Sequence, residues 1–153
     1  MTVSAGDRAP DFSLPDQFGA PVRLAGMLEG GPVILVFFPL AFSGVCTGEL
    51  AALQTELSEF AARGVQLAAV SVDSKAALRA WAEQEGYGFT LLSDFWPHGA
   101  VATAYGAFRQ DRGYASRSTF VIGRDGVIRA AFSAPLGEAR PIEAYRAALA
   151  LVE

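Results

Sequence analysis

The chain has 153 residues, of which 52% are hydrophobic and 18% are charged, and its formal net charge is −4. This length and composition are typical of a globular protein with its own core, and we expect residues 1–153 to form one domain. The sequence contains no Lys/Arg-rich block, so we expect neither nucleic acid nor an anionic membrane surface as a partner.

The chain contains one cysteine and one histidine. A single cysteine excludes an intrachain disulfide, and these two residues are too few for a dedicated zinc or iron–sulfur site, so we expect no metal and no cofactor. Residues 1–12 carry charges and lack the apolar segment of a signal peptide. The longest apolar run, 32–42, is too short to span a membrane. The expected location is the cytoplasm, where thiols remain reduced.

The first third of the chain predicts a hairpin, a buried strand and a helix. Alternating apolar residues at 12–14 and 22–24, separated by turn-forming residues, predict a short N-terminal β-hairpin. Residues 33–38 are apolar at every position, which is typical of a strand covered on both faces of an α/β sheet. Residues 49–63 follow a helical pattern that ends at Gly64, a favourable residue after a helix C-terminus.

The middle of the chain alternates between buried strands and helices. The predicted elements are a strand at 65–72, a helix at 75–85 capped by Asp73-Ser74, a strand at 89–92 and a helix at 100–105. Residues 107–116 are polar, and we expect an exposed connection there.

The last third predicts a strand hairpin and a final helix. Strands at 118–122 and 127–132 are joined by the turn Gly123-Arg124-Asp125-Gly126, and Pro141 opens a helix with one apolar side. The order β-α-β-α-β, followed by a β-hairpin and a helix, predicts an α/β fold. We expect a mixed central sheet with helices on both faces, plus the N-terminal β-hairpin.

Cys46 lies where the apolar run 33–38 gives way to a helix. Pro39 ends the strand because it cannot donate to a strand ladder, and Ser43 is a favourable N-cap three positions before the cysteine. The unpaired amides and the dipole of a first helical turn favour a thiolate, the nucleophilic form of cysteine. Glu49 lies three positions beyond Cys46 on the same side of the helix.

The same cysteine also fits an inert core position. Free cysteines are often buried as small hydrophobic residues. Cys46 lies on one helical stripe with four apolar residues, Leu50, Leu53, Leu57 and Phe60. Periodicity alone does not separate the two interpretations. The adjacent proline, the capping hydroxyl and the first-turn position favour the reactive one, because a core position needs none of them.

The segment PLAFSGVC at 39–46 resembles the peroxiredoxin motif Pro-x-x-x-Thr/Ser-x-x-Cys, and Glu49 follows at the family's usual place. The resemblance extends over the whole chain. The sequence APDF at 9–12 is similar to the family's first strand. VFFPLAF at 36–42 and LSDFWPHGAV at 92–101 resemble the alkyl hydroperoxide reductase E (AhpE)-type one-cysteine branch. The resemblance implies a thioredoxin-like fold and a thiol-dependent peroxidase.

The resemblance also implies how this site binds and attacks a peroxide. Cys46 would be the peroxidatic cysteine, which attacks the peroxide and becomes a sulfenic acid. The Ser43 hydroxyl and the backbone amides near Val45 and Cys46 would hold the peroxide. Pro39 would shield the thiolate from water.

A distant arginine completes the set of residues that the resemblance implies. Arg117 precedes the strand Ser118–Ile122, as in the family, and would stabilise the thiolate and the lengthening O–O bond. Glu49 would orient Arg117 through a charge-assisted hydrogen bond. Without the resemblance, Arg117 reads as a solvated loop arginine and Glu49 as a solvated acid of a first helical turn.

The chain lacks a resolving cysteine, so the sulfenic acid must react with an external thiol. The resemblance implies hydrogen peroxide and organic hydroperoxides as substrates. It implies mycothiol with mycoredoxin, or a thioredoxin-like protein, as the reductant. It also implies a homodimer with Phe42, Phe95 and Trp96 near the interface.

Three other functions fit parts of the pattern. A thioredoxin-type thiol–disulfide oxidoreductase needs Cys-x-x-Cys, but position 49 is glutamate. A Cys–His hydrolase would use His98 as its base, and no third partner is identifiable. A non-enzymatic redox sensor or binding module on the same fold is the alternative to the peroxidase. It predicts slow oxidation of Cys46 and no turnover with a thiol.

Overall fold

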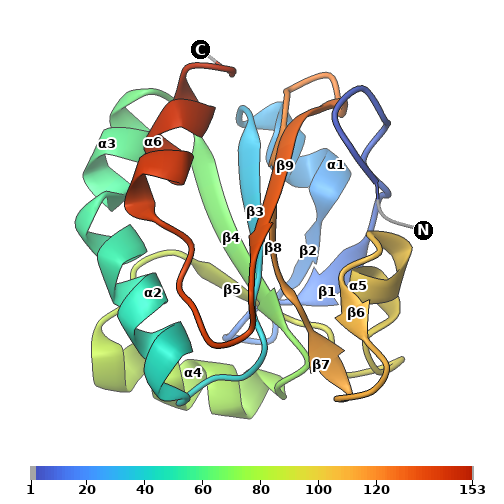
Figure 1. The fold of residues 1–153 in the computed structure, drawn as a ribbon, viewed down its shortest axis with the longest axis vertical. Helices are drawn as coiled ribbons and strands as arrows, with labels where there is room; N and C mark the ends of the chain where they lie inside the picture. Colours follow the sequence, from blue (N-terminus) through green and yellow to red (C-terminus); the bar gives the residue numbers. More distant parts are fainter. Residues whose placement is uncertain (1–2, 153) are drawn as a thin grey trace.

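The computed structural model describes residues 3–152, so the ends of the predicted domain 1–153 (Met1, Thr2 and Glu153) lie outside the described residues. The central strands are β3 (Val33–Phe37), β4 (Gln66–Ser71), β5 (Thr90–Ser93), β8 (Arg117–Ile122) and β9 (Ile128–Ala134). They form a five-stranded sheet in the order β5-β4-β3-β8-β9 (Figure 1). β3, β4 and β5 run parallel, whereas β8 is antiparallel to both β3 and β9. The predicted mixed sheet is therefore confirmed.

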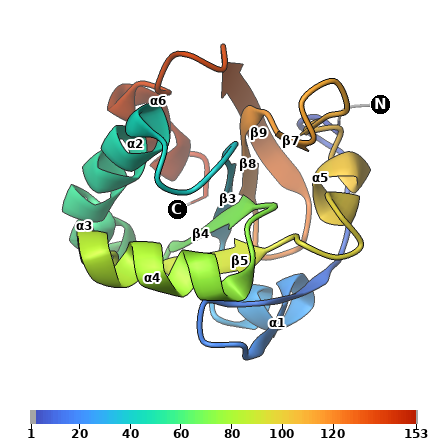
Figure 2. The ribbon, with the colours of Figure 1, turned by 90° about the horizontal axis from the view of Figure 1, so that it is seen from below.

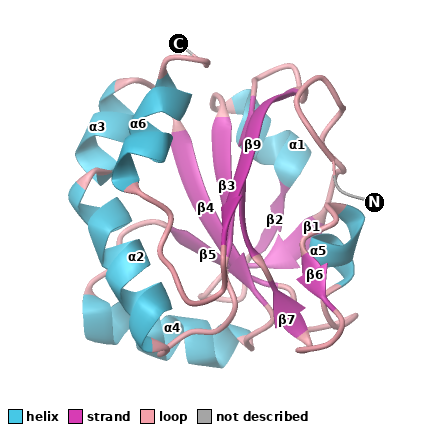
Figure 3. Cartoon of the chain, viewed as in Figure 1, coloured by secondary structure: helices cyan, strands magenta, loops and turns pink. Residues whose placement is uncertain are grey.

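Helices cover both faces of this sheet, as predicted. The helices are α1 (Leu24–Glu29), α2 (Gly44–Thr55), α3 (Leu57–Ala62), α4 (Lys75–Glu85), α5 (Ala100–Ala104) and α6 (Ile142–Leu149). α2, α3, α4 and α6 lie on one face, and α1 and α5 lie on the other (Figure 2). The predicted N-terminal hairpin is confirmed as β1 (Ser13–Pro15) and β2 (Pro21–Arg23), which Figure 3 shows beside α1. Within residues 3–152, none of the helices has the length and apolar content needed to span a membrane.

Strand β3 is buried along its whole length, which explains its uninterrupted apolar sequence. Alternate residues of a strand point to opposite faces of the sheet. Ile34 and Val36 lie in the core beneath α2, α4 and α6, whereas Leu35 and Phe37 lie in the core of the opposite face. Both faces of β3 are therefore covered, and the strand needs apolar side chains at every position.

The connection from β3 to α2 places Cys46 in the first turn of a helix. Ser43 has extended backbone angles, φ −73° and ψ 148°, and its Oγ accepts the amide of Cys46 at 3.4 Å. The predicted N-cap is thus confirmed, and α2 begins at Gly44. Cys46 belongs to the same core cluster as Val36 and Phe38, at the carboxyl end of β3, which is the middle strand of the sheet.

The helix predicted over 49–63 differs from the structure at both its start and its middle. It starts earlier, after the Ser43 cap, and Glu56 separates α2 from α3. The buried residues Leu53 and Phe60 lie on one apolar stripe that continues across Glu56. The hydrophobic period therefore did not indicate the break between the two helices.

Two other segments also differ from the sequence predictions. Leu24 was predicted to end a strand, but it begins α1, whose six residues are too few for a clear helical period. The segment 107–116, predicted to be an exposed connection, contains a small hairpin of β6 (Phe108–Arg109) and β7 (Tyr114–Ala115). Its two alanines, Ala107 and Ala115, are each 1% exposed. Short polar strands closed by an exposed turn look like a loop in the sequence.

Candidate active site

The Cys46 sulfur lies between α2 and β8, beside a guanidinium group. Arg117 Nη2 is 3.2 Å from Cys46 Sγ, although the two residues are 71 positions apart in the chain. Cys46 is 0% exposed and Arg117 is 2% exposed. A cation at this distance, shielded from water, stabilises a thiolate over a thiol. The predicted pairing of Cys46 with Arg117 is present, and the solvated interpretation of Arg117 is wrong.

The carboxylate of Glu49 joins two arginines in the same buried cluster. Arg117 Nη1 donates to Glu49 Oε1 at 3.2 Å. Arg140 donates to Glu49 from its backbone N at 2.5 Å, from Nε at 2.8 Å and from Nη2 at 2.6 Å. Glu49 is 3% exposed, so its interpretation as a solvated acid is also wrong. If Cys46 is a thiolate, its charge and that of Glu49 balance the charges of the two arginines, and the cluster has zero net charge.

The pKa of Glu49 reflects this environment. Burial alone would raise the pKa of the carboxyl, but the hydrogen bonds and charge of Arg140, followed by the charge of Arg117, hold that pKa below its usual value. Glu49 therefore stays ionised and fixes both guanidinium groups.

Arg140 belongs to the buried cluster, and the sequence analysis did not identify it. It lies in the loop between β9 and α6 and is 3% exposed. The same loop supplies the carbonyl of Leu136, which accepts a hydrogen bond from Arg117 Nε at 2.7 Å. An arginine in a polar stretch before a helix reads as a solvated residue, so no local signal identified it. Only the path of the loop across the end of the sheet brings Arg140 to Glu49.

The other predicted residues surround this cluster at different depths. Pro39 is buried, whereas Ser43 and Val45 are half-buried beside the cysteine in the chain. Cys46 is buried in the core with Leu50 and Leu53, as the core interpretation predicts. Unlike the thiol of an inert core cysteine, however, its sulfur contacts a guanidinium group.

The exposed aromatic residues and His98 lie outside the cluster. Phe42, Phe95 and Trp96 are 50%, 53% and 80% exposed. His98 Nε2 lies 2.7 Å from the carbonyl oxygen of Gly113, and its ring packs against Phe108. The structure therefore does not bring His98 to Cys46, and the hydrolase alternative lacks its base.

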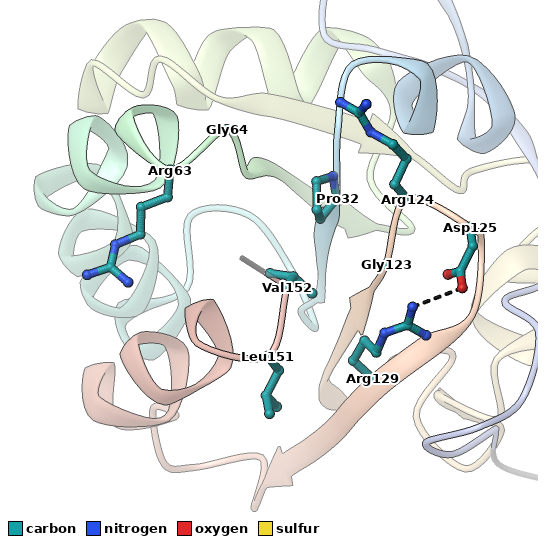
Figure 4. Close-up of a pocket in the computed structure, with 9 residues that line it drawn as sticks. All are labelled: Pro32, Arg63, Gly64, Gly123, Arg124, Asp125, Arg129, Leu151 and Val152. Carbon is teal, nitrogen blue, oxygen red and sulfur yellow. Dashed lines mark hydrogen bonds and ion pairs between the residues drawn. The ribbon is translucent and has the colours of Figure 1, made fainter.

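A cavity of about 520 Å³ lies at the opposite end of the sheet (Figure 4). Pro32, just before β3, lines it together with the turn between β8 and β9, whereas Cys46 follows the other end of β3. The guanidinium groups of Arg63, Arg124 and Arg129 point in different directions, and Arg129 pairs with Asp125 at 2.9 Å (Figure 4). This cavity is not part of the cysteine site.

We expect Glu49→Gln to destabilise the protein by about 3–5 kcal/mol at pH 7, because it leaves two buried guanidinium groups without their carboxylate. A carboxyl with a depressed pKa contributes stability above its unfolded-state pKa, near 4.3, and loses it as the pH falls through the folded-state value. The difference between wild type and Glu49→Gln should therefore shrink below about pH 4. Urea unfolding between pH 3 and pH 7 would measure it.

Glu83→Gln is the matched control for this change. Glu83 pairs with Arg79 one helical turn away, and both side chains are more than half exposed. Exposed pairs of this kind contribute about 0.5 kcal/mol or less, so this variant should unfold like the wild type. Equal stabilities of the two variants at pH 7 would contradict a structural role for the Glu49 carboxylate.

Comparison with known proteins identifies the family of this chain. Residues 5–131 match the model of the AhpC/TSA family. Alkyl hydroperoxide reductase E of Mycobacterium tuberculosis is 47% identical over 148 residues, which cover 97% of each chain. The crystal structure of peroxidoxin BcpB from Mycobacterium tuberculosis has a TM-score of 0.85 and 32% identity, covering 97% of this chain and 96% of that one. The crystal structure of Enterococcus faecalis AhpC has a TM-score of 0.88 and 26% identity, with 98% and 92% covered. The chain therefore belongs to the AhpC/TSA family and is a peroxiredoxin of the alkyl hydroperoxide reductase E type, an oxidoreductase of the thiol peroxidase class.

Proposed function

We propose that this protein reduces hydrogen peroxide and organic hydroperoxides through Cys46 alone, with an external thiol as the reductant. The observation that carries this proposal is the 3.2 Å contact between Cys46 Sγ and Arg117 Nη2 inside a buried, charge-balanced cluster. A single cysteine in the chain supports the one-cysteine mechanism.

In the first step the Cys46 thiolate attacks the terminal oxygen of the peroxide, the one that carries the hydrogen. The S–O bond forms as the O–O bond breaks, and Cys46 becomes a sulfenic acid. The departing oxygen takes up a proton from solvent water and leaves as an alcohol, or as water when hydrogen peroxide is the substrate. Negative charge moves from sulfur to that oxygen, and the Arg117 guanidinium, 3.2 Å from the sulfur, would donate to it as the charge develops.

Ser43 supports the same step from the N-terminus of α2. Its Oγ accepts the amide of Cys46, so the hydroxyl proton is available to a bound peroxide. Val45 is half-buried, and its amide would add a second donor at this helix start. Because Cys46 is 0% exposed, the peroxide reaches it when the segment before α2 moves, and Pro39 limits the entry of water.

In the second step an external thiol resolves the sulfenic acid. Its sulfur attacks the Cys46 sulfur, a mixed disulfide forms and water leaves. A second thiol then attacks the mixed disulfide and releases the Cys46 thiolate together with an oxidised reductant. Mycothiol with mycoredoxin, or a thioredoxin-like protein, supplies these thiols in the proposal.

The proposal includes a homodimer formed through three exposed aromatic residues, Phe42, Phe95 and Trp96. Phe42, four positions before Cys46, and Phe95 and Trp96 after β5 are each at least half exposed. Large exposed aromatic side chains are typical of interfaces. Sedimentation of the wild type should give the mass of two chains, and Trp96→Glu should shift it towards one. A wild type that sediments as one chain at micromolar concentration would exclude this part of the proposal.

Mass spectrometry after one equivalent of peroxide tests the function directly. Without a thiol, one added oxygen should map to Cys46; with a low-molecular-weight thiol, that oxygen should be replaced by the thiol adduct. Stopped-flow fluorescence would follow the oxidation through Trp81, whose ring lies 5.4 Å from Phe38 and 6.2 Å from Phe42. Oxidation no faster than that of free cysteine, without turnover, would favour the redox sensor or binding module instead.

A further inference from the structure

The buried cluster continues past Arg140 to two hydroxyl groups that the proposed reaction does not use. Arg140 Nη1 donates to Thr119 Oγ1 at 3.1 Å, and Thr119 Oγ1 donates to Tyr145 Oη at 3.3 Å. Thr119 is 0% exposed and Tyr145 is 1% exposed. We propose that Thr119 and Tyr145 are positioning residues of the peroxidase, acting through Arg140 and Glu49 on the guanidinium beside Cys46. This inference rests on the proposed function.

The strand and helix periods place the two hydroxyl groups on the side of the sheet that carries the cysteine. Thr119 follows Arg117 by two positions in β8, so both side chains point to the same face. α6 covers that face, and Tyr145 lies on its buried side. Arg140 comes from the loop between β9 and α6, and Glu49 comes from α2. The hydrogen-bonded chain therefore ties the C-terminal helix to the helix that carries Cys46.

The Thr119 hydroxyl needs Tyr145 because it has only one proton. A guanidinium is a donor only, so Thr119 Oγ1 must accept from Arg140 and must direct its own proton elsewhere. Tyr145 Oη is the acceptor that fixes this orientation. Burial, partly offset by the charge of Arg140, raises the pKa of Tyr145 to about 12, so the phenol stays neutral at physiological pH.

Packing explains the ring of Tyr145 but not its hydroxyl group. The ring lies 5.3 Å from that of Phe132 in an edge contact, within the core beneath α6. A phenylalanine ring would make the same contact without burying a polar atom. Burying a hydroxyl group costs free energy unless the group is hydrogen-bonded. The Tyr145 hydroxyl instead fixes the orientation of the Thr119 hydroxyl and, through Thr119, the position of the Arg140 guanidinium.

Small displacements along this chain reach the reacting sulfur. Three of the hydrogen bonds to the Glu49 carboxylate come from Arg140, and the same carboxylate accepts from Arg117. If Arg140 loses its contact with Thr119, the carboxylate and then the Arg117 guanidinium are held less firmly. Reaction rates depend steeply on such placement, with about 10²-fold lost for a misplacement of 1 Å.

Two variants remove one hydroxyl each while keeping the side-chain volume: Tyr145→Phe and Thr119→Val. We expect each to slow the oxidation of Cys46 by hydrogen peroxide roughly tenfold, as for one lost hydrogen bond. We also expect the pH profile of Cys46 alkylation by iodoacetamide to move to higher pH, because Arg117 stabilises the thiolate less well. Urea unfolding of each variant would show that it remains folded.

The charged and titratable groups that act directly on Cys46 are Arg117 on β8, Arg140 in the loop after β9 and Tyr87 before β5. Glu49 on α2 and Tyr145 on α6 belong to the same buried cluster and act on the two arginines. Thr119→Val removes none of them, so a shifted profile in that variant reports the position of the existing charges.

Tyr105→Phe is the matched control. Tyr105 is 0% exposed and its hydroxyl donates to the Pro10 carbonyl in the core of the opposite face. This variant should keep both the oxidation rate and the alkylation profile of the wild type. The inference is overturned if Tyr145→Phe and Thr119→Val show the same pH profile of Cys46 alkylation as Tyr105→Phe. It is also overturned if they only lose stability and the alkylation profile does not move. Alkylation needs no peroxide, so a wild type that reacts slowly with peroxide contradicts the proposed function independently.

Discussion

Replacing Cys46 with serine is expected to abolish peroxide reduction, with a loss of about 10⁴-fold or more, as for other catalytic nucleophiles. A serine hydroxyl stays protonated at neutral pH and is a poor nucleophile, whereas the Arg117 guanidinium stabilises a thiolate at this position. The chain has no second cysteine that would take over the reaction. Peroxide consumption with excess thiol would measure the loss.

The serine variant should still fold, because its hydroxyl is smaller than the thiol and can accept a hydrogen bond from Arg117. It should unfold at a lower urea concentration than the wild type, because it removes one of the two anions that balance the buried guanidinium groups. A single cooperative urea transition would attribute the lost activity to chemistry instead of unfolding. If the variant consumes peroxide at a substantial fraction of the wild-type rate, then the reaction takes place at another residue, and the proposed function is wrong.

Replacing Arg117 with methionine is expected to slow the oxidation of Cys46 by about 10²–10³-fold, the usual cost of removing one donor from a site of developing negative charge. The change removes the donor 3.2 Å from the sulfur and one partner of Glu49. It also leaves the Leu136 carbonyl without its donor. Stopped-flow fluorescence and the pH profile of alkylation would measure the effect.

If the methionine variant is unstable, Arg117→Lys provides a second test of the role of this guanidinium in the oxidation of Cys46. A lysine retains the charge, but its ammonium cannot reproduce the flat guanidinium that contacts Cys46, Glu49 and Leu136 at once, so we expect an intermediate rate. Arg124→Met, in the exposed turn after β8, is the matched control and should react like the wild type. Wild-type rates in both Arg117 variants would exclude a role for this guanidinium.

Much of the fold was predictable because its determinants are local. Ser43 caps α2 through the amide three positions later, so the cap is visible in four consecutive residues. The turn at 123–126 joins two strands that pair directly with each other. α1 and the small hairpin of β6 and β7 were missed because each is too short for a clear hydrophobic period.

The sequence by itself determined that a single cysteine begins a capped helix after a fully buried strand, because these features depend on neighbouring residues. Only the tertiary structure decided which charges surround that cysteine. Arg117 and Arg140 reach Glu49 across 68 and 91 positions of the chain. An arginine has the same local pattern whether it is solvated or buried against a carboxylate. Strand pairing between β3 and β8, and the return of the loop after β9, bring these charges together.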